Sequence, residues 1–215
     1  MPDPLTRVLN AFPAGFFAGL MEHCDASFAT ANNLAKQHFE SPEQPAMRGQ
    51  LRHGRLEAGF REAALDAGLA PRACYTKGYG SRFSVVGANG VYLLRSNVQA
   101  HCGPPRPAHF RKEWAQLNEW LNPFQPNLLE RREEPPSDRL CGMIVVTCRK
   151  NGGDPTVADF VGLGIPRSDL SAWVVLEPLT NLLALYHDMD TRRHAAKEIE
   201  VKVRDKAKPK LKRSS

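Results

Sequence analysis

Residues 82–94 have the sequence Arg-Phe-Ser-Val-Val-Gly-Ala-Asn-Gly-Val-Tyr-Leu-Leu, and this stretch decides the fold class. The β-branched and aromatic side chains on either side of Asn89-Gly90 are typical of strands. An Asn-Gly dipeptide tolerates positive φ at both central positions of a two-residue turn. The stretch therefore predicts a β-hairpin.

A second hairpin is expected further along the chain. Residues 140–148 form a nearly continuous apolar run, which is typical of a central strand. Residues 151–155 (Asn-Gly-Gly-Asp-Pro) predict a turn, and residues 158–165 predict the returning strand. We expect the two hairpins to form a mainly antiparallel sheet of about four strands.

The helical segments are recognised by apolar residues at three- and four-residue steps. Residues 14–39 and 46–67 are predicted as two helices joined by a short Pro-containing link, which favours an antiparallel helical hairpin. Gly68 is expected to end the second helix in a left-handed conformation. Two further helices are predicted over 107–121 and 178–188. Because strands and helices do not alternate singly, the predicted fold class is α+β.

The predicted organisation has three regions. Residues 1–69 form the N-terminal helical hairpin region, and residues 70–191 form the α+β core. Within that core, residues 122–138 are polar and Pro-rich and are expected to form an exposed loop. Residues 192–215 form a basic tail.

Positive charge is concentrated in this tail. The chain of 215 residues has a net charge of +6. The last 24 residues hold ten Lys and Arg against three acids, a net charge of +7, and the preceding 191 residues carry −1. This distribution indicates an arm that attracts polyanions.

Hydropathy and cysteine usage limit the protein class. No apolar run approaches the roughly 18 residues that span a bilayer, so a membrane association is not expected. The five cysteines include no CxxC pair, which predicts free thiols in a reducing compartment and neither a zinc site nor another cofactor. The predicted location is cytoplasmic, and the basic tail leaves a nuclear location open.

The main functional hypothesis is a non-enzymatic protein that binds nucleic acid or an acidic macromolecular complex. In the second helix, Arg48, Arg52 and Arg55 are spaced at i, i+4 and i+7 and therefore share a face that could follow phosphates. The tail would supply the other contacts. The tail residues predicted to bind are Arg192, Arg193, Lys202, Arg204, Lys206, Lys208, Lys210, Lys212 and Arg213.

Two alternatives come from different classes. Trp120 lies off the apolar stripe of its helix and could anchor a protein interface, which would make the protein an adaptor or a neutralising partner subunit. Glu200-Val201-Lys202 matches the acid-x-lysine part of a divalent-metal nuclease site, with Asp188 or Asp190 as the further carboxylate. In a charged segment this tripeptide also arises by chance.

Overall fold

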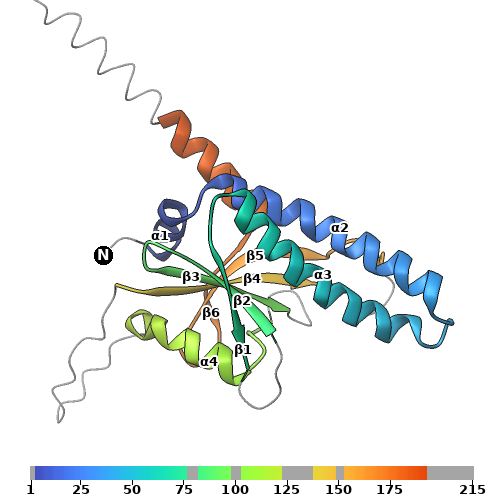
Figure 1. The fold of residues 1–215 in the computed structure, drawn as a ribbon. Coiled ribbons are helices and arrows are strands. Elements are labelled where there is room, and N and C mark those ends of the chain that lie inside the picture. The colour runs from blue at the N-terminus through green and yellow to red at the C-terminus, as the bar shows by residue number, and fades with distance from the viewer. Residues whose placement is uncertain (1–2, 77–81, 98–102, 123–137, 149–152, 193–215) are drawn as a thin grey trace, which may run out of the picture.

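The computed structural model describes residues 3–76, 82–97, 103–122, 138–148 and 153–192 (Figure 1). A sheet separates two helical layers. The elements outside the sheet are α1 (Pro4–Ala11), α2 (Ala14–His38), α3 (Gln44–Asp66), α4 (His109–Ala115), the 3-10 helix η1 (Gln116–Leu121) and a helix over residues 179–192. The strands are β1 (Pro71–Tyr75), β2 (Arg82–Ala88), β3 (Val91–Asn97), β4 (Leu140–Thr147), β5 (Phe160–Pro166) and β6 (Trp173–Pro178).

The α+β class is confirmed, but the sheet is larger than predicted. It has six strands in the order β1-β2-β3-β4-β5-β6, where about four were expected. Strand β1 escaped prediction because Pro-Arg-Ala-Cys-Tyr is short and half polar, with no apolar alternation. Strand β6 was not predicted, whereas the helix expected from residue 178 begins at residue 179.

Both predicted hairpins are present. Strands β2 and β3 pair antiparallel around Asn89 and Gly90, whose φ angles are 48° and 77°. Strands β4 and β5 also pair antiparallel. The connection between the hairpins was not predicted, because β3 pairs with β4 in parallel through a crossover that contains α4. The sheet is therefore mixed.

Alternation along β4 supplies a core on each side of the sheet. Ile144 and Val146 pack against the layer of α2 and α3, whereas Met143 and Val145 pack against the side of α4. Every residue of β4 is buried, as expected for a central strand covered on both faces. The prediction for residues 140–148 is confirmed at this point.

The helical hairpin is confirmed, with α2 and α3 lying side by side on one face of the sheet (Figure 1). Gly68 ends α3 with a φ of 73°, as predicted. Helix α1 was missed. Its N-terminus is capped by Asp3, whose carboxylate accepts a hydrogen bond of 3.1 Å from the backbone of Thr6. The 179–192 helix is held by Tyr186, whose hydroxyl donates to the carbonyl of Phe12 at 2.7 Å.

The single helix predicted over 107–121 is divided into α4 and η1. The side chain of Asn118 is fully buried, and its amide donates to the carbonyls of Cys141 (2.9 Å) and Pro166 (2.8 Å). Its oxygen accepts from the backbone N–H of Cys141 at 2.7 Å. These three bonds tie η1 to β4 and β5. Helical periodicity depends only on the spacing of apolar residues, so it cannot predict tertiary hydrogen bonds of this kind.

Candidate functional site: an arginine pocket

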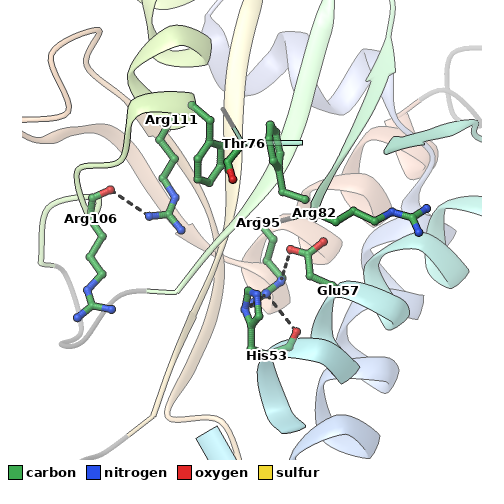
Figure 2. Close-up of a pocket in the computed structure, with 9 residues that line it drawn as sticks. His53, Glu57, Thr76, Arg82, Arg95, Arg106 and Arg111 are labelled. Atoms are coloured by element: carbon green, nitrogen blue, oxygen red, sulfur yellow. Dashed lines mark hydrogen bonds and ion pairs between the residues drawn. The ribbon is translucent and has the colours of Figure 1, made fainter. Parts of the chain in front are cut away.

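One end of strands β1–β3 carries a pocket between the two helical layers. Helix α3 borders it on one side of the sheet, and α4 with the segment before it borders it on the other (Figure 2). Its volume is about 220 Å³. The lining residues are His53, Glu57, Thr76, Arg82, Phe83, Arg95, Arg106, Phe110 and Arg111. We call this site the arginine pocket.

The arginine pocket is strongly cationic. Four arginines line it, and Glu57 is the single carboxylate among its lining residues. This contrasts with the near-neutral charge of residues 1–191 as a whole. Guanidinium groups collected around one small volume favour an anion there, because phosphate and carboxylate oxygens accept their N–H bonds.

Arg95 of β3 is buried at the base of the arginine pocket. Its side chain is 3% exposed, and its Nε donates to Oε1 of Glu57 at 3.1 Å. One of its terminal nitrogens lies 2.7 Å from Nδ1 of His53 and 3.3 Å from the His53 carbonyl. Burial lowers the pKa of Arg95, and Glu57 opposes that change. The guanidinium is thus held in place by α3.

This contact defines the proton position on His53. A guanidinium has donors and no acceptor, so Nδ1 of His53 accepts and the ring proton is on Nε2. Burial and then the charge of Arg95 lower the pKa of His53, although Glu57 raises it. His53 is therefore a neutral N–H donor at the mouth of the arginine pocket.

Arg106 and Arg111 approach from the opposite side (Figure 2). A terminal nitrogen of Arg111 donates to the carbonyl of Arg106 at 3.1 Å. Within the described residues, the buried Nε of Arg111 has no hydrogen-bond partner. Burial, then Arg95 and Arg106, lower the pKa of Arg111 to about 10. An anion in the arginine pocket would oppose this lowering of the pKa.

The wall that carries these two arginines is anchored to the sheet. The indole N–H of Trp173 on β6 donates to the carbonyl of Gly103 at 2.8 Å, which holds the segment before α4. The ring of Phe83 on β2 packs against the ring of Phe110 on α4, and their centroids are 4.3 Å apart. Arg82 extends from the start of β2 to the other side of the view in Figure 2, so it belongs to the rim.

The predicted arginine face on α3 is a different surface. His53 and Glu57 lie near each other on the helix, whereas Arg55 is about 200° from His53 around its axis. Arg55 is exposed. Arg48 donates to Asn32 of α2 at 3.1 Å. Its binding role and that of Arg55 stay predictions.

Arg52 of that face is half-buried and has partners within the chain. Its guanidinium lies 4.0 Å from the ring centroid of Phe28, and it donates to the carbonyl of Pro155 at 3.1 Å. Burial lowers its pKa. Arg52 therefore joins α3 to α2 and to the turn before β5. Its predicted binding role stays a prediction.

Trp120, the predicted interface residue, is half-buried on η1. Its indole N–H donates to the carbonyl of Arg139 at 2.9 Å, and the guanidinium of Arg7 lies 5.3 Å from its ring centroid. The ring also packs against the core on the side of α2. The protein-interface role of Trp120 stays a prediction.

The remaining predicted residues lie at or beyond the 179–192 helix. Asp188, Asp190 and Arg192 are exposed on that helix. Glu200, Lys202 and the tail residues from Arg193 onward lie outside the described residues, as does nearly all of the predicted loop 122–138. Among the described residues, no group of His, Cys, Asp and Glu side chains is placed to hold a metal ion.

The described cysteines carry free thiols, and Cys102 lies outside the described residues. Burial raises the pKa of Cys24 to about 12 and that of Cys141 well above its ordinary value. No described helix has the combination of length and hydropathy that crossing a bilayer requires.

Sequence reasoning missed the arginine pocket. Its arginines come from β2, β3, the segment before α4, and α4 itself. The one available signal was Arg95, a charge directly after the apolar run Val91–Leu94, because a charge in a buried strand requires a partner. Comparison of the chain with protein-family models, curated proteins and solved structures found no match.

Proposed function

We propose that this protein binds nucleic acid and that the arginine pocket holds one of its phosphate groups. The observation that carries the proposal is the set of four arginines around a pocket of about 220 Å³ whose only lining carboxylate is Glu57. Arg95 is already paired with that carboxylate. The remaining cationic charge matches an anionic group from another molecule.

A phosphate fits this arrangement better than a protein carboxylate. Its oxygens point in several directions, and the donors of the arginine pocket come from both sides of the sheet. Arginine is the side chain of choice for such contacts because its planar fork gives paired N–H bonds.

The basic tail contributes to the proposal through charge alone. The tail has a net charge of +7, and all of it except Arg192 lies outside the described residues. It would add contacts that depend on charge rather than on sequence. Arg55, exposed on another face of α3, would add to this diffuse attraction. Two kinds of contact are thus proposed: a phosphate held in the arginine pocket and diffuse attraction by the tail.

The test is fluorescence anisotropy of labelled single-stranded DNA, single-stranded RNA and duplex DNA at several salt concentrations. Each phosphate contact contributes about 0.7–0.9 to the slope of log K against log salt. We expect Arg106→Gln together with Arg111→Gln to weaken binding and to reduce the slope by about 1–2 units. A full-length variant with the tail lysines replaced by Gln should reduce the slope further.

Arg167→Gln is the matched control. Arg167 is exposed in the turn between β5 and β6, at the other half of the sheet, and its substitution removes one positive charge, as each of the two pocket substitutions does. Arg167→Gln should change the affinity and the slope less than the pocket substitutions do. The proposal fails if wild-type protein binds none of these nucleic acids at low salt, or if polyglutamate binds it more tightly than they do.

A further inference from the structure

We propose that the arginine pocket receives the phosphate monoester at the end of a nucleic-acid strand in preference to a phosphodiester within the strand. This inference rests on the proposed nucleic-acid binding and specifies which phosphate is bound. It is carried by the charge and the size of the arginine pocket and by the arrangement of its donors.

The charge of the arginine pocket exceeds what a phosphodiester supplies. Arg82 points away from the pocket, so the other three lining arginines and one glutamate leave two positive charges, with His53 neutral. A phosphodiester brings one negative charge. A terminal monoester brings about 1.5–2 at pH 7, because its second pKa is near 6, and it presents three strong acceptor oxygens.

The size of the arginine pocket suits a chain end. Pockets that enclose an entire drug-sized ligand measure roughly 300–1,000 Å³. At about 220 Å³, the arginine pocket has room for an anionic group and little more. A phosphodiester would have to enter with chain continuing from both of its ester oxygens, whereas a terminal phosphate enters with chain on one side only.

The donors of the arginine pocket come from both sides of the sheet. Arg95 of β3 lies at the base and His53 of α3 at the mouth, while Arg111 of α4 faces them and Arg106 lies farther out, before α4 (Figure 2). Arg95 is held by Glu57 and by His53, so it needs little ordering when a ligand binds.

The experiment uses the full chain and a short single-stranded oligonucleotide with an internal fluorophore. It is prepared with a 5′-phosphate, with a 3′-phosphate, with hydroxyls at both ends, and as a closed circle. We expect a phosphorylated end to increase affinity about tenfold, which corresponds to about 1.4 kcal/mol. Preference for the 5′ or for the 3′ form supports the inference and identifies the end that enters.

Two pocket variants and one control locate the preference. Arg111→Gln should reduce it below about threefold, which is under 1 kcal/mol. Arg106→Gln should do the same, and its exposed side chain makes it the safer variant for folding. Arg167→Gln should keep the full preference. At constant ionic strength, inorganic phosphate should weaken binding of the phosphorylated oligonucleotide more than binding of the hydroxyl form.

The failures of the two proposals differ. Equal affinity for all four oligonucleotides, circle included, would overturn the terminal-phosphate inference and leave nucleic-acid binding standing. A preference that persists in both pocket variants would also overturn it, because the selecting group would then lie elsewhere. Absence of binding to every form would remove the proposed function and this inference with it.

Discussion

Nε of Arg95 on β3 lies 3.1 Å from Oε1 of Glu57 on α3, and the two side chains are 3% and 10% exposed. This buried ion pair joins the sheet to the helical layer and forms the base of the arginine pocket. The second oxygen of Glu57 is buried without a hydrogen-bond partner among the described residues. The pair therefore links the stability of the fold to the proposed site.

Replacing Glu57 with Gln should destabilise the protein by about 3 kcal/mol, because it leaves the charge of Arg95 buried without its counter-charge. Urea unfolding gives the change in free energy. Glu62→Gln on the same helix is the control, since its side chain is 60% exposed, and it should cost less than about 1 kcal/mol. The double variant Glu57→Leu with Arg95→Met should recover stability relative to Glu57→Leu alone. Equal losses for Glu57→Gln and Glu62→Gln would contradict the role assigned to the pair.

His53 should make the stability of the protein depend on pH. Its pKa in the folded protein lies below the 6.5 of the free side chain, so acid protonates the unfolded chain first. The contribution is fully present above pH 6.5 and declines as the pH falls below that value. The charged groups facing the ring are Arg95 from β3, Arg111 from α4 and Glu57 from its own helix.

The measurement is urea unfolding of wild-type protein and His53→Gln at about pH 7.5 and about pH 5.5, on either side of the histidine pKa. Wild-type protein should lose more free energy of unfolding on acidification than the variant does. Carboxylates contribute equally to both proteins, so the difference isolates His53. The same pH dependence in both proteins would show that the pKa of His53 is not lowered in the folded state.

Arg52 and Arg55 should respond differently although both belong to the arginine face of α3. Arg52→Gln removes the contact with the Phe28 ring and the bond to Pro155, and we expect it to lower stability by about 1–2 kcal/mol. Arg55→Gln changes an exposed side chain and should alter stability by less than about 0.5 kcal/mol. Thermal and urea unfolding distinguish them. Similar stabilities of the two variants would mean that the contacts of Arg52 contribute nothing.

Asn118→Ala should be among the more damaging single substitutions, at about 3 kcal/mol, because it leaves buried backbone groups of β4 and β5 without partners. Asn181→Ala is the control: Asn181 is exposed, and its bond is to Glu177 four residues earlier. Unfolding in urea measures both. If Asn118→Ala is as mild as the control, water replaces its hydrogen bonds and η1 is not fastened by this side chain.

The part of the fold that could be predicted depends on local sequence patterns. Asn89-Gly90 specifies its hairpin because the backbone requirement of the turn is met by those two residues themselves. The helices α2 and α3 follow from apolar periodicity over more than twenty residues each. Strand β1 and helix α1 were missed because short, partly polar segments acquire their structure from neighbours.

The pairing of β3 with β4 could not be predicted, because parallel pairing depends on a long crossover and not on a turn. The division of residues 107–121 depends on Asn118, whose partners are 23 and 48 residues away. In both cases the deciding contact is between residues distant in sequence.

The sequence by itself determined the α+β class, the two hairpins, the helical pair and the segregation of positive charge, since each depends on neighbouring residues or on composition. Only the tertiary structure decided which arginines act together. Arg48 and Arg52 share a helix face by spacing yet contact other parts of the chain. Arg95, Arg106 and Arg111 converge because the crossover through α4 returns the chain to the end of β3, and like charges gathered at that end attract an anion.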